Sequence, residues 1–185
     1  MKFIAFAATN HRTSLNAKLV GAALDMYKAE FAAGIDVEML DMNDYEMPIY
    51  SMERQEADGV PALAQEFYDK IGAADAVIAS FAEHNGNFTV AYKNVFDWAS
   101  RIDMKVFQGK PAVLMSTSPG PGGGANVLRT VVGGAPFFGV DLAGSFSVPR
   151  FMENFDMATG TLTSEEAIRE LRTALTALHE KLSAA

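Results

Sequence analysis

The chain has 185 residues, of which 49% are hydrophobic and 21% charged, and its formal net charge is −8. These values fit one globular domain with a substantial core and exclude a disordered or fibrous chain. The acidic balance argues against nucleic acid as a partner, because such binding needs basic surface that neutralises phosphates. The sequence has no cysteine, which excludes disulfides, thiolate metal ligands and a cysteine nucleophile.

The sequence also lacks targeting and membrane signals. The first residues show no basic segment followed by a long apolar stretch. No apolar run reaches the length of a membrane span. We therefore expect a cytoplasmic protein with no membrane partner.

Apolar, strand-like runs alternate with helical patterns in the first half of the chain. The acidic, irregular stretch 41–59 predicts a long loop or a partly ordered excursion. Proline is favoured at the first position of a helix, so Pro61 marks a helix start. The predicted elements are a strand over 2–7, a helix over 14–33, a strand over 35–40 and a helix over 61–72.

The second half continues the alternation. Its elements are strands over 76–81, 112–115 and 140–146 and helices over 90–100, 125–132 and 164–183, the last capped by Ser164. Five buried strands separated by helices predict an α/β fold with a parallel sheet covered on both faces. Ligands of such sheets bind beyond the carboxyl ends of the strands. We expect the loops 8–13, 81–89 and 116–124 to form one site there.

The first of these loops has the composition of a phosphate site. Thr9, Ser14 and Asn16 supply side-chain donors, and His11 and Arg12 supply positive charge. The helix that follows presents unpaired N–H groups and a favourable dipole to an anion. The loop lacks the spaced glycines of a dinucleotide site and the lysine of a P-loop. The alternative is that a hydroxyl here only caps the helix.

The second and third loops can contact a planar ring. Asn85-Gly86 is a strong turn signal, so the second loop is either a plain connection or a source of amides for a heterocycle. His84 fits a solvated position better than a proton-transfer role. In the third loop, residues 119–124 comprise four glycines and two prolines. Glycine permits close approach of the backbone to a ligand, and the alternative is a flexible loop without function.

A resemblance to a known family rests on these loops. The chain resembles the NADPH-dependent FMN reductase family, a flavodoxin-like group that includes chromate, quinone and azo-dye reductases. The family's phosphate turn reads Gly-Ser-x-Arg-x-x-Ser-x-Asn. Thr9 stands at the first hydroxyl, Ser14 and Asn16 match directly, and His11 replaces the arginine with Arg12 beside it.

The other two motifs of the family also have counterparts. The family's Pro-Glu-Tyr-Asn-Gly-Ser is similar to residues 82–87, where alanine and histidine replace proline and tyrosine. The family's Lys-Asn-x-x-Asp-Trp matches residues 93–98, in which Lys93 and Asp97 are spaced to pair on a helix. Residues 118–124 are similar to the family's loop beside the flavin ring.

The resemblance implies a flavodoxin-like three-layer sandwich with strand order 2-1-3-4-5, formed by a single FMN-binding domain over residues 1–185. It implies an enzyme that passes hydride from NADPH or NADH through FMN to a small-molecule electron acceptor: a quinone, azo compound, metal oxyanion or free flavin. We assign no catalytic acid or base and no metal ligand. Family members form dimers or tetramers, so we expect a homodimer or homotetramer, with residues 45–52 and the aromatic residues near Trp98 as candidate interface.

The resemblance also implies which residues bind the cofactor, and two other functions stay open. A flavodoxin-type electron carrier would lack nicotinamide activity. A flavodoxin-like protein that has lost its flavin would serve as a binding or regulatory module. The residues predicted to bind FMN are Thr9, His11, Arg12, Ser14, Leu15 and Asn16 at the phosphate, and Ala82, Glu83, His84, Asn85, Gly86, Asn87, Ser118, Pro119, Gly120, Gly122 and Gly123 around the ring.

Overall fold

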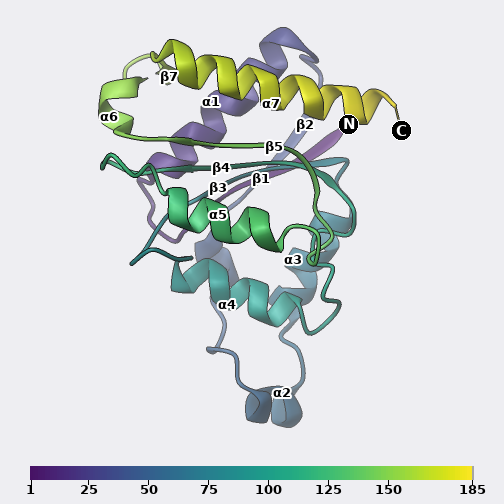
Figure 1. Cartoon of the computed structure of the whole chain (residues 1–185). Helices are drawn as coiled ribbons and strands as arrows, with labels where there is room; N and C mark the ends of the chain where they lie inside the picture. Colours follow the sequence, from purple (N-terminus) through teal and green to yellow (C-terminus); the bar gives the residue numbers. More distant parts are fainter. Residues whose placement is uncertain (185) are drawn as a thin grey trace.

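A five-stranded parallel sheet forms the centre of the molecule. The computed structural model describes residues 1–184. Its strand order, β2-β1-β3-β4-β5, confirms the predicted fold (Figure 1). The strands are β1 (Lys2–Ala8), β2 (Asp36–Leu40), β3 (Ala76–Phe81), β4 (Pro111–Thr117) and β5 (Asp141–Val148).

Helices cover both faces of this sheet and complete the three layers. In Figure 1, α1 and α7 lie on one face, and α3, α4 and α5 lie on the other. None of the helices within residues 1–184 combines the length and hydropathy that a membrane crossing requires. The main helices are α1 (Leu15–Glu30), α3 (Ala62–Gly72), α4 (Val90–Ala99), α5 (Ala125–Gly134) and α7 (Glu165–Ser183).

The sheet divides the apolar core into two layers, because successive side chains of a strand point to opposite faces. On β1, Phe3 and Ala5 pack into the layer under α1 and α7, whereas Ile4 and Phe6 pack into the layer over α3 and α4. All residues of β3 are buried. This two-sided burial explains why the inner strands β1, β3 and β4 are largely continuous apolar runs, whereas the edge strands β2 and β5 are more exposed.

The stretch 41–59 is partly ordered, which agrees with the second of its two predicted alternatives. It holds a 3-10 helix, η1 (Met42–Tyr45), and a short helix, α2 (Met52–Asp58), neither of which was predicted as an element. Ser51 caps α2 by accepting a hydrogen bond from the Arg54 N–H, and Gly59 ends the helix at φ 77°. None of its residues is buried, so its sequence has no apolar periodicity from which a helix could be predicted. The helix projects from the body of the molecule (Figure 1).

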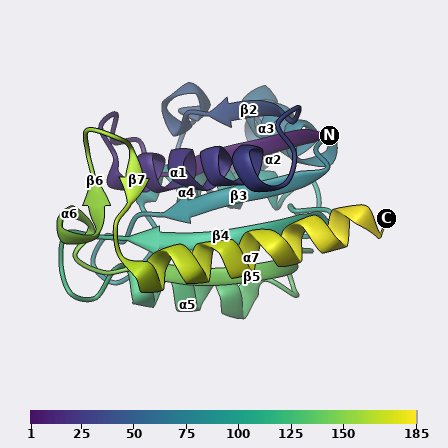
Figure 2. The same cartoon turned by 90° about the horizontal axis from the view of Figure 1, so that it is seen from above.

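The stretch 149–163, which carried no prediction, connects β5 to α7. It contains α6 (Phe151–Asn154) and a small antiparallel pair, β6 (Phe155–Asp156) and β7 (Thr161–Leu162). Figure 2 shows this pair at the end of the sheet toward which β3 and β4 point. The remaining differences are small. Pro61 is the N-cap of α3 rather than its first residue, and Ser164 caps α7 as predicted.

Candidate functional site

The strand register brings the three polar loops to one edge. Ala8 pairs with Phe81, and Phe81 pairs with Ser116. The last residues of β1 and β3 therefore lie in one row across the sheet with Ser116 near the end of β4. The loops that follow these strands leave from the same edge, and together with the N-cap and first turn of α1 they carry all the residues predicted to bind a cofactor.

The side chain of Asn16 links the elements at this edge of the sheet by hydrogen bonds. The residue is 4% exposed. Its Oδ1 accepts hydrogen bonds from Ser80 Oγ at 2.7 Å and from the Thr117 N–H at 3.1 Å. Its Nδ2 donates to the Thr117 carbonyl at 3.2 Å. One side chain thus links the first turn of α1 to β3 and β4, a role that the sequence did not reveal.

The first loop presents free donors outward. Ser14 caps α1, because its Oγ accepts from the Asn16 N–H at 3.1 Å. This hydrogen bond confirms that Ser14 caps the helix. Because the Oγ accepts in this bond, the hydroxyl proton of Ser14 is not used by it. The backbone N–H groups of Arg12, Thr13 and Leu15 have no acceptor within residues 1–184. Unpaired N–H groups at a helix start favour an anion.

The positive charge of this loop is accessible as well. The side chains of His11 and Arg12 are exposed. Both line a hollow of about 180 Å³ that Thr9 and Asp41 also line, the Asp41 carboxylate being engaged by hydrogen bonds from Asn43. The Thr9 Oγ1 accepts a hydrogen bond from the His11 N–H at 3.2 Å, which shapes the turn. The loop therefore joins hydroxyls, N–H groups and cationic side chains in one place, the donor set that an oxyanion requires.

The second loop is a tight hairpin. His84 and Asn87 exchange two backbone hydrogen bonds at 2.9 and 3.1 Å. Between them, Asn85 and Gly86 have φ values of 52° and 79°, as in a type I′ turn. Thr89 anchors the end of the loop: its Oγ1 donates to the Ala8 carbonyl at 2.9 Å and caps α4. The hairpin is thereby held beside the first loop.

Glu83 connects the second loop to the third. Its carboxylate accepts hydrogen bonds from the backbone N–H groups of Asn126 at 2.9 Å and Val127 at 3.0 Å. These groups belong to the first turn of α5, where the helix dipole favours negative charge. Glu83 therefore sets the spacing between the hairpin and the glycine loop.

Close backbone contacts shape the glycine loop. Gly123 has φ +58°, and a Cβ there would lie 2.8 Å from the Pro149 nitrogen. Its carbonyl accepts a hydrogen bond from Ser116 Oγ at 2.9 Å. The Gly120 carbonyl accepts from the Arg150 N–H at 2.9 Å. The loop is thus held against the segment that follows β5.

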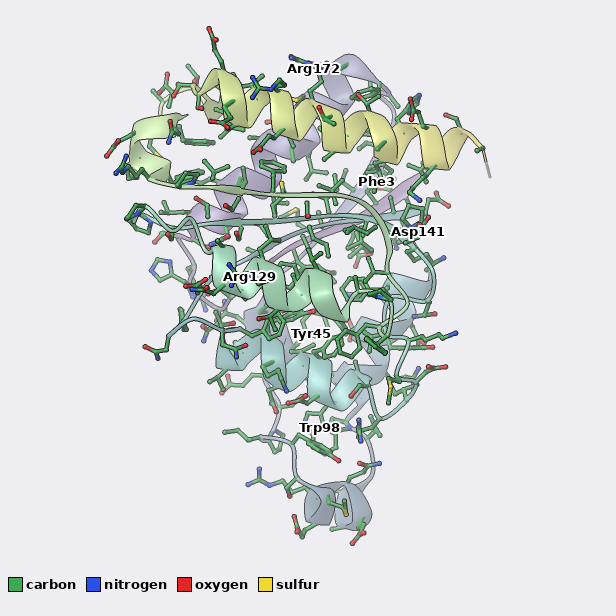
Figure 3. The ribbon with its side chains drawn as sticks, viewed as in Figure 1. Phe3, Tyr45, Trp98, Arg129, Asp141 and Arg172 are labelled. Atoms are coloured by element: carbon green, nitrogen blue, oxygen red, sulfur yellow. The ribbon has the colours of Figure 1, made fainter. Side chains whose placement is uncertain are left out.

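Two side chains of the motif at residues 93–98, which lies on α4, form hydrogen bonds to the segment before α2. The Asn94 Nδ2 donates to the Met47 carbonyl at 3.0 Å, and the Trp98 Nε1 donates to the Pro48 carbonyl at 2.7 Å. Trp98 is 1% exposed, which places it in the core, and Figure 3 shows it on the side of α4 toward α2. Lys93 and Asp97 pair at 2.6 Å, as their spacing predicts.

A cavity of about 310 Å³ opens between the first loop and the start of α4. Asn10 of the first loop and His84 and Thr89 of the second loop line it. Its outer wall comes from the segment between β2 and α2. The edge of the sheet therefore offers an anion-binding turn, two loops that can flank a planar group, and a neighbouring cavity.

Comparison with known proteins identifies the class. Residues 1–153 match the family described as NADPH-dependent FMN reductase, so the chain belongs to this family. It is 30% identical over 188 residues to an NAD(P)H:quinone oxidoreductase of Solanum tuberosum, covering 96% of this chain and 91% of the relative. It is 31% identical over 124 residues to an NADPH:quinone oxidoreductase of Arabidopsis thaliana, covering 67% of this chain and 61% of the relative. A reductase of Pseudomonas aeruginosa matches over 45% of its own length.

Solved structures agree with this assignment. The flavoenzyme NAD(P)H:(acceptor) oxidoreductase FerB from Paracoccus denitrificans superposes with a TM-score of 0.74 at 25% identity, covering 99% of this chain and 97% of FerB. An apo NADH:FMN oxidoreductase, EMOB, gives a TM-score of 0.71 at 21% identity, covering 100% of this chain and 91% of that protein. The second likeness shows the shared flavodoxin-like fold.

Proposed function

We propose that this protein is an FMN-dependent NAD(P)H oxidoreductase that reduces a small-molecule acceptor. Family membership supports this function, as do the names of the quinone reductases that the chain resembles. The observation that carries it is the first loop. There, the N–H groups of Arg12, Thr13 and Leu15 have no acceptor within the described chain, and the Arg12 guanidinium and the His11 imidazole lie beside them.

The donor chemistry fits the phosphate of FMN. The hydroxyls of Thr9 and Ser14, the free N–H groups and the Arg12 guanidinium would hold it. His11 stands where the family has arginine, so the phosphate would receive less fixed charge from that position. The buried amide of Asn16 is engaged within the protein, and we propose that it supports the phosphate turn from behind.

The flavin ring would lie between the hairpin 84–87 and the glycine loop. When bound, FMN accepts hydride from NAD(P)H and passes electrons to the acceptor. The protein's own contribution is orientation. Glu83 fixes the spacing of the two loops, and backbone N–H groups at the hairpin turn and glycine loop are available to polar atoms of a ring.

We also propose that the protein forms a homodimer or homotetramer. Part of the predicted interface is engaged within the chain, because Tyr45, Met47 and Trp98 are buried. Ile49 and Met52, which flank the start of α2, are each 65% exposed. Large exposed apolar side chains on a projecting element are typical of a subunit contact.

Absorption spectroscopy with a matched pair of variants tests the function. We expect the purified protein to bind FMN, with flavin bands that bleach anaerobically when NADPH or NADH is added. Arg12→Ala should weaken FMN binding by about tenfold to a hundredfold, the value of a charge-assisted hydrogen bond. Lys28→Ala, at the opposite end of α1, should leave binding unchanged.

Other results would point to the alternative functions. Bound flavin that stays oxidised with both nicotinamides would indicate an electron carrier. A protein that takes up no FMN after reconstitution would indicate a binding or regulatory module. Equal FMN affinity in Arg12→Ala and Lys28→Ala would contradict the assignment of the first loop to the phosphate.

A further inference from the structure

We propose that the 310 Å³ cavity beside the first loop receives the electron acceptor, and that Glu46 on its wall selects uncharged quinones over anionic acceptors. This inference rests on the proposed function and narrows its substrate class. The overall reaction would convert NAD(P)H, one proton and one quinone into NAD(P)⁺ and one hydroquinone. The nicotinamide supplies the hydride, that is, both electrons and one hydrogen, and the single proton comes from water.

The position of the cavity suits an acceptor. Asn10 belongs to the proposed phosphate turn, and His84 belongs to the hairpin proposed to flank the ring. The cavity therefore adjoins two of the three cofactor loops. No residue of the glycine loop lines it, which leaves the space between hairpin and glycine loop for the cofactor. A molecule in the cavity would lie next to the cofactor rather than in its place.

The walls of the cavity suit a small neutral ring. Met42, Met47, Ile49 and Val90 give it apolar surface, and the side chains of Asn10 and Asn43 add hydrogen-bonding groups. The volume lies near the lower end of the roughly 300–1,000 Å³ that small-molecule sites span. It can hold one or two fused rings but is small for a free flavin nucleotide.

The charges around the cavity disfavour an anion. Within residues 1–184, its lining includes no lysine or arginine, while Glu46 contributes a carboxylate. The other four cavities described each have at least one lysine or arginine in their lining. Tyr45 also lines the cavity, and burial raises the pKa of its phenol, so it is uncharged at neutral pH. Asp41 and Asp44, on the same segment, add to the negative field.

Nearby cations offset this field only in part. The Arg54 guanidinium donates to the carbonyl of Ile49 on the cavity wall, but it is one charge against the carboxylates of Glu46, Asp41 and Asp44. Arg12 faces the hollow at the first loop, where the cofactor phosphate would neutralise it. Lys70 pairs with Glu38 at 3.1 Å and with Glu66 at 2.8 Å. Lys93 pairs with Asp97 and lines a different cavity. An oxyanion, a sulfonated dye or a free flavin phosphate would therefore meet a net negative field at this cavity.

A matched pair of quinones tests the proposal. We would titrate 1,4-naphthoquinone and 1,4-naphthoquinone-2-sulfonate into the oxidised, FMN-loaded protein without nicotinamide and measure dissociation constants by calorimetry. The ratio of kcat/KM for the two compounds would be measured separately. The chain has no cysteine that could add to a quinone. We expect the neutral compound to bind more tightly and to be reduced more efficiently.

Variants separate the charge effect from a change in folding. Glu46→Gln should tighten binding of the sulfonate by about threefold to tenfold, because one exposed charge at a few ångströms is removed, and should leave the neutral quinone unchanged. Val90→Lys, at a side chain that is 68% exposed on the rim, should shift the ratio in the same direction. Glu170→Gln, on α7 across the sheet, is the control. It should change neither the binding of the sulfonate nor the ratio of kcat/KM for the two quinones. Added salt should reduce the wild-type discrimination.

Two results would overturn the proposal while the proposed function stands. One is that the protein reduces 1,4-naphthoquinone, but neither Glu46→Gln nor Val90→Lys changes the ratio of kcat/KM for the two quinones. The other is a wild-type preference for the sulfonate. Flavin that bleaches with nicotinamide but reduces neither quinone would also overturn the acceptor assignment alone. Bound flavin that stays oxidised with NADPH and NADH would reject the oxidoreductase function, and the acceptor assignment with it.

Discussion

At the residue scale, two side chains predicted as cofactor ligands are engaged within the protein. Asn16 bonds to Ser80 and Thr117, and Glu83 accepts from the first turn of α5. Both side chains form hydrogen bonds that link separate segments of the site, so neither is without a partner within the protein. Their direct contact with FMN stays a prediction, but their structural effect does not depend on it. Each sets the position of groups that would meet the cofactor.

Replacement of Asn16 tests this structural role. Asn16→Ala leaves the Ser80 hydroxyl and the Thr117 N–H buried without a partner, and we expect it to lower the free energy of unfolding by about 2–4 kcal/mol. Urea denaturation measures this change. Thr13→Ala, in the same loop but exposed, is the control and should cost less than about 0.5 kcal/mol. Equal stability of the two variants would show that the Asn16 bonds contribute nothing.

At the scale of elements, the glycine loop is a shaped connection between β4 and α5. Its conformation depends on positive φ angles and on the approach of residues 149–150. The neighbouring glycines differ in what they require. Gly123 has φ +58° and lies against Pro149, whereas a Cβ at Gly122 would meet no atom within 4 Å. This contrast provides a matched pair of substitutions.

We expect Gly123→Ala to destabilise the protein by about 2 kcal/mol or more, because left-handed backbone and a clash with backbone atoms both oppose a Cβ. Gly122→Ala should be nearly neutral for stability. Thermal unfolding of both variants measures the difference. If the loop orders the ring site, Gly123→Ala should also weaken FMN binding more than Gly122→Ala does. Identical melting temperatures would argue that the loop adapts freely.

At the scale of the whole molecule, α2 is the element that its own chain does not cover. It buries none of its residues, although Asn94 and Trp98 hold the segment that leads to it. A firmly attached but uncovered arm suits contact with a second copy. This contact would also lie near the proposed acceptor cavity, because Ile49 lines that cavity.

A charge introduced on the arm tests the proposed assembly. We expect the native protein to sediment as a dimer or tetramer and Met52→Asp to weaken association at least tenfold, because a charge buried in an apolar contact is unfavourable. Met157→Asp, at another exposed methionine (45% exposed), should leave association unchanged. Analytical ultracentrifugation over a range of concentrations measures both. A native monomer would refute the oligomer.

Local patterns were sufficient for most of the fold. Continuous apolar runs identified the three inner strands, because β1, β3 and β4 are buried on both faces of the sheet. Capping hydroxyls such as Ser14 and Ser164 marked helix starts, and Asn85-Gly86 marked the hairpin turn. These signals act between residues close in sequence, so they can be recognised without knowledge of the chain's path. The helix α2 was missed because it has caps but no apolar face.

The partners of the polar side chains required the folded chain. Asn16 meets Thr117 across 101 positions, and Glu83 meets Asn126 across 43. Such pairs depend on which strands are neighbours and in what register, and nothing in either local sequence specifies that. The cavity beside Glu46 arises in the same way, from a segment after β2 packed against α4. Short-range sequence therefore encodes the elements and the loop chemistry, whereas long-range packing sets which groups the site can use.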